Sequence, residues 1–400
     1  MEWGRGKWSF LLILQTQPGS QQAMKKIAII FLTSLATFTI SAQLPETLKV
    51  TPIGRVLMDG AFYAPDGDGL TSGVAVPDVR LGAKFAYQQW NGKIDVSYSY
   101  GKVKMKDVFL QYNPSGTSYI RAGYFCHHYG LNSQVSSSTV PAMEWLTVDE
   151  FFSASVRNLG VMYVRSAPRY FLGVSGIIDA QSLTEPANEQ GKVSYGGVGR
   201  LVARPLTGTA GTVHLGVSGW IQSALHQEDN PEGYFDFSAK FPTRVCKTVA
   251  IEADVTDARS AFKFSPELLL SRGRLALESQ YYYMSVARRD RAAYKAQGFY
   301  AMLRGIVHGA GYSYDAVNAM LATPRPGSLE LTGAFNYIDG NDRHSGICPG
   351  RMNDTSVTLS YYINRYLTAR MRYSYTYISD SPIYGDRHAN IVQARIQFKF

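Results

Sequence analysis

The segment HANIVQARIQFKF, residues 388–400, decides the fold that we expect for this chain. Apolar side chains occupy every second position from Val392 to Phe400, and polar side chains occupy the positions between them, from Gln393 to Lys399. Because successive side chains on a strand point to opposite faces, this pattern indicates a β-strand with one apolar and one charged face. An unpaired strand edge attracts other chains, and hydrocarbon cannot satisfy free backbone groups. We therefore expect this strand to pair with the first one and to close a transmembrane antiparallel β-barrel.

The beginning of the sequence has the pattern of a secretory signal. Two lysines follow Met24, an apolar run covers residues 27–40, and small residues precede Gln43. This charged start, short apolar middle and small-residue end are typical of an export signal, and the run is too short for a good spanning helix. We expect a spurious N-terminal extension at 1–23, a signal peptide at 24–42 and an outer-membrane barrel at 43–400.

Composition excludes several classes of protein. The chain has 40 basic and 31 acidic residues and a formal net charge of +9, but it lacks the clustered basic runs of a nucleic-acid-binding protein. Its three cysteines, Cys126, Cys246 and Cys348, are an odd and widely spaced set. In an oxidising compartment such a set makes at most one disulfide and no disulfide framework. No later segment has enough consecutive apolar residues for a helix in lipid, so we expect the exported product to be either soluble or a barrel.

Alternating segments recur along the chain after residue 50. One pair, Val79–Tyr87 and Ile94–Tyr100, flanks an Asn-Gly turn typical of a hairpin. The raw count is seventeen or eighteen strands, because Tyr234–Phe241 and Val249–Val255 are weak segments. If both ends lie on the periplasmic side the number must be even, and merging Val213–Leu270 into one strand and a long outer loop makes sixteen. In a soluble sandwich the same apolar rows would meet in a core.

If the apolar rows face lipid, the polar rows line the lumen, where basic side chains predominate. The expected pore-lining, anion-binding residues are Arg80, Lys84, Arg121, Arg200, Arg204, Arg274, Arg304, Arg370, Arg372 and Arg395. Rows of guanidinium groups suit an anion or phosphate pore, since they replace part of the hydration of the ion. The alternative is that these arginines pair with luminal carboxylates and only hold the barrel in shape.

Motifs for other chemistry are weak. Ser260 and Lys263 match a Ser-x-x-Lys pattern without its partner motifs, and Cys126-His127-His128 has no second pair of metal ligands at a suitable spacing. We expect no enzyme activity, no catalytic residues, no metal and no cofactor. An outer-membrane hydrolase with an Asp, His and Ser cluster at the rim is the alternative.

Several short motifs occur in a characteristic order. They are Lys106–Tyr112, Tyr119–Phe125, Gly130–Asn132, Ser136–Ser138, Met143-Glu144, Gly199–Leu201, Glu278–Tyr282, Phe335–Tyr337 and Arg395–Phe400. In this order they resemble the phosphate-selective porin O and P family, over essentially the whole mature chain.

The resemblance implies a sixteen-stranded outer-membrane barrel, a homotrimer, and loops folded inward to form an anion-selective constriction. Cys126–Val156 would be one such loop, Thr243–Arg259 another, and Gly309–Pro326 a periplasmic turn that enters the lumen. The constriction loop would carry Ser136, Ser137, Ser138 and Glu144.

These expected luminal segments hold few basic residues, which departs from a phosphate-selective pore. We therefore expect a passive diffusion channel for small anions, with phosphate as one candidate solute and membrane lipid as the outer partner. A general non-selective porin and a barrel that acts as an adhesin or structural anchor are the alternatives.

Overall fold

The computed structural model describes residues 48–400, except 68, 154–156, 180–182, 184–191, 209–210 and 228–229. The expected extension at 1–23 and the expected signal peptide at 24–42 lie outside the described residues. Within the described part, no helix is both long enough and apolar enough to cross a membrane.

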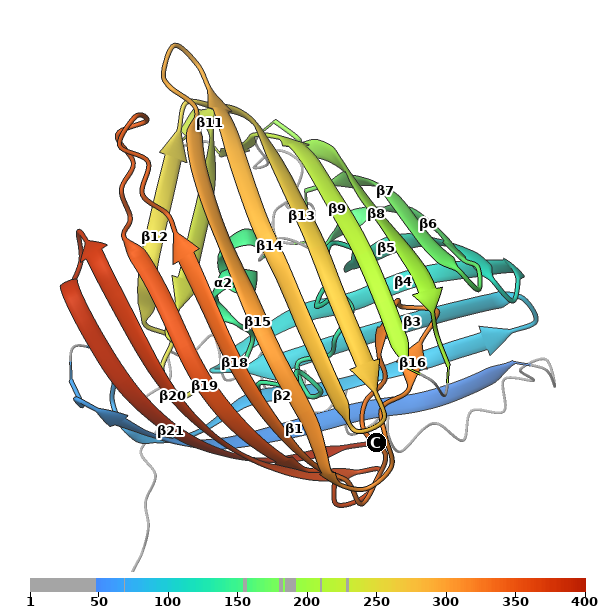
Figure 1. Cartoon of the computed structure of the whole chain (residues 1–400). Helices are drawn as coiled ribbons and strands as arrows, with labels where there is room; N and C mark the ends of the chain where they lie inside the picture. The colour runs from blue at the N-terminus through green and yellow to red at the C-terminus, as the bar shows by residue number, and fades with distance from the viewer. Residues whose placement is uncertain are drawn as a thin grey trace, which may run out of the picture. The chain divides into compact units, whose positions relative to one another are not determined.

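Sixteen antiparallel strands of the described chain form a closed barrel (Figure 1). In wall order they are β1 (Lys49–Ala64), β2 (Gly73–Tyr87), β3 (Trp90–Ser99), β4 (Lys102–Ser115), β5 (Ser118–Cys126), β6 (Arg157–Ser166), β7 (Tyr170–Ile178), β8 (Tyr195–Leu206), β9 (Thr212–Ser223), β13 (Ala258–Arg272), β14 (Leu275–Arg288), β15 (Tyr294–His308), β18 (Leu329–Asp339), β19 (Arg351–Tyr361), β20 (Leu367–Ser381) and β21 (Gly385–Lys399). The last strand pairs with the first from Lys399 opposite Arg55 to Asn390 opposite Ala64. The predicted closure and the count of sixteen are confirmed.

One detail of the predicted strand count is wrong. The region Val213–Leu270 contributes two wall strands, β9 and β13, which pair directly with each other. The weak segments between them are real strands, β11 (Asn230–Lys240) and β12 (Val249–Thr256), but they form a separate three-stranded sheet with β10 (Leu225–Gln227). Their side chains also alternate between buried and exposed, as Glu252, Ala253 and Asp254 of β12 show, so alternation alone does not distinguish them from wall strands.

The distribution of exposed side chains is that of a membrane barrel. On β21 the apolar residues Val392 and Ile396 are 45% and 53% exposed, whereas Arg395, in the intervening row, is 1% exposed. The apolar side chains therefore face outward and the charged and polar side chains face inward, as a hydrocarbon environment requires. Together with the closed wall, this excludes the soluble two-layer alternative.

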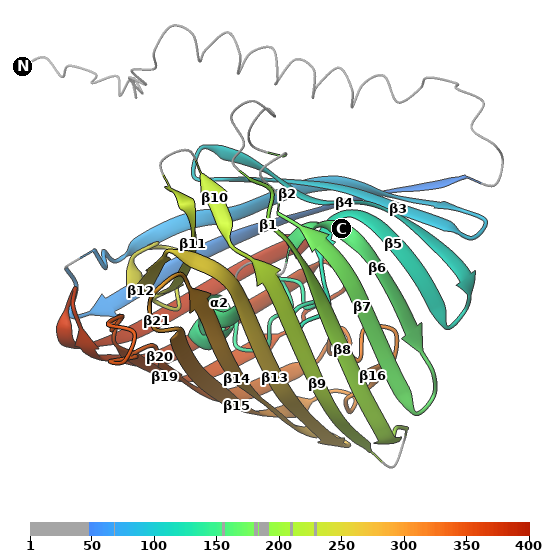
Figure 2. The ribbon, with the colours of Figure 1, turned by 90° about the horizontal axis from the view of Figure 1, so that it is seen from above.

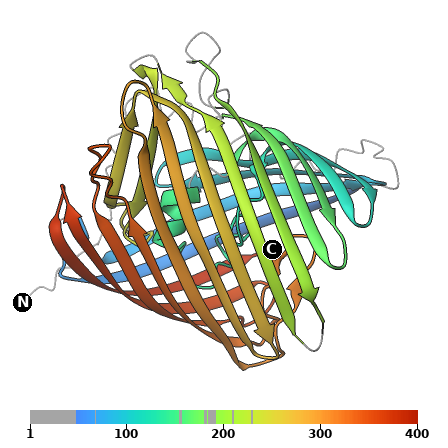
Figure 3. The ribbon, with the colours of Figure 1, turned by 45° about the horizontal axis from the view of Figure 1, so that its top comes forward.

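A long connection enters the barrel from the end of β5. It includes the helix α2 (Thr147–Ser153), which lies inside the ring of strands in every view (Figures 2 and 3). The ring of Phe152 stacks on Tyr282 of β14 at 5.4 Å between centroids, and Phe151 belongs to the same buried apolar cluster. The predicted inward folding of Cys126–Val156 is confirmed for its described residues, and the loop fills the lumen beside β13–β15.

Two further segments contact the inner wall. The turn between β15 and β18 carries the short strands β16 (Tyr314–Asp315) and β17 (Met320–Leu321), and Arg200 of β8 donates to two of its carbonyl groups. The predicted entry of this turn into the lumen is confirmed. The prediction for Thr243–Arg259 holds in part: the Thr243 hydroxyl bonds to Tyr63 of β1, but Val249–Thr256 is strand β12.

Candidate functional site

A cavity of about 830 Å³ lies inside the barrel. Strands β2 to β5 form one side of it, and the inner loop between β5 and β6 together with residues 240–247 forms the other. The described residues that line it include nine basic side chains and five carboxyl groups. The lining is therefore positive, and the positive groups come mainly from the wall.

Charged side chains on this wall form a continuous chain of ion pairs. Arg80 of β2 lies 3.3 Å from Asp78 and 3.5 Å from Asp95, and Lys93 of β3 lies 3.1 Å from Asp95. Lys93 also lies 2.7 Å from Asp107 of β4. The ends of the chain are Arg55, which pairs with Asp78, and Arg157, which pairs with Asp107. Four cations thus share three carboxylates, so this chain keeps one positive charge in excess.

Three more cations of the wall strands line the cavity without a described carboxylate as partner. Lys104 and Lys106 come from β4, and Arg121 comes from β5. A β-bulge in the pairing of β3 with β4 turns two consecutive residues, Lys106 and Asp107, toward the cavity. Simple alternation would place only one of them there.

The inner loop is bound to the wall through its backbone and through its polar side chains. Arg55 donates to the hydroxyl oxygens of Ser136, at 2.7 Å, and of Ser137. The carbonyl of Ser138 accepts from Arg370 at 3.1 Å and from Gln397 at 2.8 Å. The loop therefore has a determined position against the strands on both sides of the barrel seam.

The predicted constriction residues lie close together but in different settings. Ser136, Ser137 and Glu144 line the cavity, whereas Ser138 lies behind it against β20 and β21. Glu144 pairs with Arg395 and, at 3.0 Å, with Arg244. Its charge is thus compensated from two sides.

The predicted pore-lining residues do not form one row along the cavity. Arg80 and Arg121 line it, and Lys84 is an exposed residue of β2. Arg274 lies in the exposed turn between β13 and β14, so its predicted place in the inner row of a strand is wrong. Arg272 pairs with Leu275, and Gly273 and Arg274 therefore form the hairpin turn between the two strands.

The other predicted arginines are buried against fixed partners. Arg200 pairs with Glu267, Arg304 with Glu278 and Glu330, Arg372 with Asp354, and Arg395 with Asp59 and Glu144, while Arg204 and Arg370 donate to backbone carbonyl groups. For these residues the geometry matches the alternative reading, in which arginine and carboxylate pairs hold the barrel in shape.

Several cavity cations were missed by sequence reasoning. Lys93 and Lys106 stand in polar rows of recognised strands, so alternation could have indicated them. Lys240 is the last residue of β11, and Arg244 and Lys247 lie in Thr243–Arg259, the segment expected to fold inward. No local signal in the sequence places these three in one cavity with β4.

Titratable groups of the inner loop are shifted by burial. Burial raises the pKa of Asp149 in α2 to about 7, although hydrogen bonds from Tyr282 and Asn132 favour the ionised form. Burial lowers the pKa of His127 to about 4, so its imidazole is neutral at physiological pH. Around neutral pH, therefore, Asp149 carries only part of a charge.

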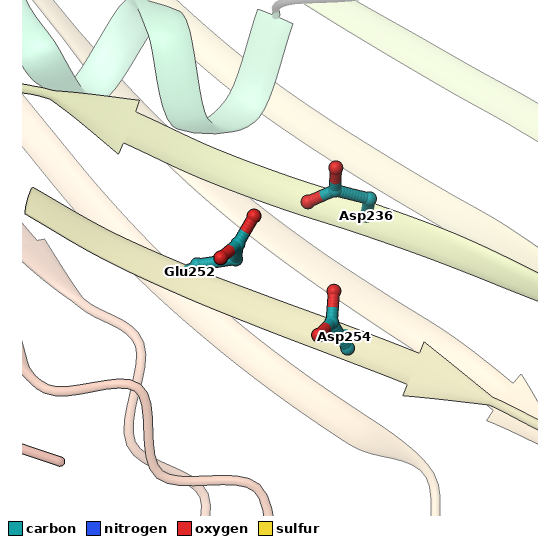
Figure 4. A group of neighbouring side chains, drawn as sticks. All are labelled: Asp236, Glu252 and Asp254. Carbon is teal, nitrogen blue, oxygen red and sulfur yellow. The ribbon is translucent and has the colours of Figure 1, made fainter. Parts of the chain in front are cut away.

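Acidic side chains also gather on the separate sheet. Asp236 of β11 and Glu252 and Asp254 of β12 are exposed, and one oxygen of each lies within 4.8 Å of the others (Figure 4). Carboxylate oxygens suit calcium or magnesium, but exposed acidic groups of this kind are common without an ion, and we assign no metal to them. Cys126, His127 and His128 form no such group with a further ligand among the described residues.

Comparison with solved structures places the fold among outer-membrane channels. The anion-selective porin from Comamonas acidovorans superposes with a TM-score of 0.57 at 10% identity, covering 88% of this chain and 100% of that one. A loop L8 deletion mutant of OmpT from Vibrio cholerae gives 0.56 at 11%, covering 89% and 100%. The channel DcaP of Acinetobacter baumannii gives 0.54 at 11%, covering 89% and 99%.

Comparison of the sequence itself is more specific. No curated protein matches the chain. The family model described as phosphate-selective porin O and P matches residues 54–400, which is nearly the whole barrel. The chain therefore belongs to the phosphate-selective porin O and P family and is an outer-membrane porin of bacteria.

Proposed function

We propose that this porin is a passive diffusion channel for small anions and that the path of the anions follows the inner wall of β2–β5. The observation that carries the proposal is the excess of cations in the cavity, nine against five carboxyl groups. An aqueous space with an excess of one sign of charge between low-dielectric walls concentrates counter-ions. Anions are expected to enter it and cations to be repelled.

The cations that act on a solute are those without a fixed partner. We assign this role first to Lys104, Lys106 and Arg121, because no described carboxylate neutralises them. Arg80 and Lys93 share carboxylates within the ion-pair chain, so they contribute a weaker field. The buried arginines such as Arg304 and Arg372 hold the wall and do not contact the solute in this proposal.

The narrowest part of the path is assigned to the inner loop. Ser136 and Ser137 present hydroxyl groups at the cavity boundary, and Arg55 orients both. Hydroxyl donors beside a guanidinium can replace part of the hydration shell of an anion without holding it too tightly to leave. Phosphate is the solute that the family name suggests, and it is one arm of the test below.

We also propose that the chain assembles as a homotrimer. OmpT from Vibrio cholerae, solved in a trimer form, superposes with a TM-score of 0.55 at 11% identity, covering 89% of this chain and 100% of that one. Light scattering on the detergent-extracted protein tests this assembly. A monomeric mass at micromolar concentration would contradict it.

Planar-bilayer recording tests the channel. In a potassium chloride gradient, the reversal potential of the wild type is expected to shift from zero toward the equilibrium potential of chloride. A variant with Lys104→Gln, Lys106→Gln and Arg121→Gln is expected to move toward equal permeability, because the three wall cations without a carboxylate partner are then neutral. Competition between phosphate and chloride measures whether phosphate is preferred.

The matched control removes the same number of charges elsewhere. Arg272→Gln, Arg343→Gln and Arg365→Gln change exposed residues outside the cavity, so the reversal potential should stay at the wild-type value. A cation-selective or unselective wild type would refute the proposed function.

A further inference from the structure

Arg121 has an environment unlike that of the other cavity cations. Its Nε and Nη2 both donate to Oε1 of Gln111, at 2.9 and 2.7 Å. Its Cζ lies 4.2 Å from the ring centroid of Phe109, 5.0 Å from that of Tyr119 and 5.4 Å from that of Phe125. Three aromatic rings and one amide thus hold a guanidinium that has no described carboxylate partner.

This arrangement prepares one edge of the guanidinium for an anion. Gln111 occupies two of its donor nitrogens, and Nη1 makes no hydrogen bond with a described residue. Arginine is weakly hydrated and its planar group stacks on rings. The stacking therefore fixes the orientation of the group, and an incoming carboxylate displaces little water from it.

The cavity also offers aromatic surface to a solute. The lining residues Phe125, Tyr129 and Phe241 are at most 2% exposed, but Tyr100 is 41% exposed and Trp145 is partly exposed, so the last two rings are open to a solute. An inorganic anion gains nothing from these rings, whereas a solute with an aromatic body gains both apolar contact and ring packing. A volume of about 830 Å³ lies within the range of sites that hold small organic molecules, roughly 300 to 1,000 Å³.

We propose that this cavity selects aromatic carboxylates, with the carboxylate bound at Nη1 of Arg121 and the ring of the solute packed against the open rings of Tyr100 and Trp145. This inference rests on the proposed anion channel and specifies its substrate class. Selection arises because one cavity recognises both the charge of the solute and its ring. Phosphate and chloride can use only the first of these two contacts.

Block of the chloride current measures this selection. Benzoate, cyclohexanecarboxylate, acetate and phosphate are each added to a bilayer that holds wild-type channels, and the half-blocking concentration is recorded. Benzoate is expected to block at the lowest concentration. Cyclohexanecarboxylate has the same charge and a similar size without the aromatic ring, so equal block by this anion, by acetate or by phosphate would overturn the proposal.

Two conservative variants locate the site. Arg121→Lys keeps the positive charge but loses the stacked planar group, and Phe125→Leu removes one ring. Each is expected to raise the half-blocking concentration of benzoate about fivefold, the size of one cation–ring contact. Unchanged benzoate block in both variants would refute the assignment of the site to Arg121.

Arg365→Lys is the matched control, because Arg365 also lies over a ring, that of Tyr366 at 4.4 Å, but in an exposed turn outside the cavity. Heat-dependent migration on SDS gels checks that each variant forms a closed barrel. A wild type without anion selectivity would refute the channel itself, whereas an anion-selective wild type that benzoate blocks no better than acetate would refute only this inference.

Discussion

Arg395 on the last strand donates two hydrogen bonds to Asp59 on the first strand, from Nε to Oδ1 at 2.7 Å and from Nη2 to Oδ2 at 2.6 Å. The same guanidinium donates to the carboxylate of Glu144 and, at 2.8 Å, to the carbonyl of Met143 in the inner loop. One side chain therefore joins the closure of the barrel to the position of the loop.

Replacement of Arg395 by Gln should weaken both connections. Asp59 and Glu144 would keep buried charges with less compensation, and breaking a buried pair of this kind costs about 3 to 5 kcal/mol. We expect the folded barrel to unfold at a lower temperature on SDS gels. We also expect a larger single-channel conductance with more current noise. Arg343→Gln, at an exposed loop position, is the control. A quiet channel with wild-type conductance would show that Arg395 does not hold the loop.

Replacement of Asp107 by Asn should change selectivity in the opposite direction to the loss of a lysine. Asp107 pairs with Lys93 at 2.7 Å and also with Arg157, so its neutralisation leaves both cations less compensated beside the cavity. The reversal potential in a potassium chloride gradient should shift further toward the equilibrium potential of chloride. Asp386→Asn, at the exposed start of β21, should cause no shift. A shift toward potassium in the Asp107 variant would contradict the proposed path.

The stability of the inner loop should depend on pH through Asp149. Burial raises the pKa of this carboxyl group to about 7, whereas an exposed aspartic acid titrates near about 3.9. Below about pH 4 the group is protonated in both folded and unfolded chains. Between about pH 4 and 7 the unfolded chain releases the proton and the folded chain retains it, so stability falls as pH rises through this window and stays lower above it.

Asp149→Asn removes this dependence and keeps a polar group of the same shape beside Tyr282 and Asn132. We expect the variant to match wild type at pH 4 and to exceed it at pH 8 in the melting temperature of the refolded barrel. Parallel melting curves for the two proteins across this range would show that Asp149 does not titrate in the window. Glu150→Gln is the control, because Glu150 pairs with Lys240 at a half-exposed site.

Gly130 is expected to tolerate no larger residue. Its φ of +73° is unfavourable for other residues, and an added Cβ would lie 2.0 Å from Nε2 of Gln280. Gln280 accepts from the backbone of Leu131 at 3.1 Å, so its displacement would loosen the start of the inner loop. Gly130→Ala should cost about 2 kcal/mol or more, from the strained backbone and the clash.

Gly199→Ala is the comparison for this change, because an added Cβ there meets no atom within 4 Å and its φ is not positive. Thermal unfolding of both refolded variants measures the difference. Equal melting temperatures would show that the inner loop can shift to make room at Gly130.

Alternation alone predicted the strands and their two faces. In β21 each residue has the opposite orientation to the next one, whatever the rest of the chain does, so the outward row of Val392 and the inward row of Arg395 follow from the sequence. The same argument placed Arg80 and Arg121 inside the barrel. It could not place Arg274, because a hairpin one residue longer or shorter moves that side chain from the wall into the turn.

The tertiary structure alone decided which inner cations are neutralised. Arg395 meets Asp59 across 336 positions of sequence, and Arg304 meets Glu330 through the pairing of β15 with β18. Lys106, next to the bulge in β4, has no ion pair with a described carboxylate. The orientation of a side chain depends on its neighbours in the chain, but its ionic partner depends on strand register and on the loop that folds over it. The sequence therefore determined a barrel with a basic interior, and the fold determined where in that interior the charge is free to act on a solute.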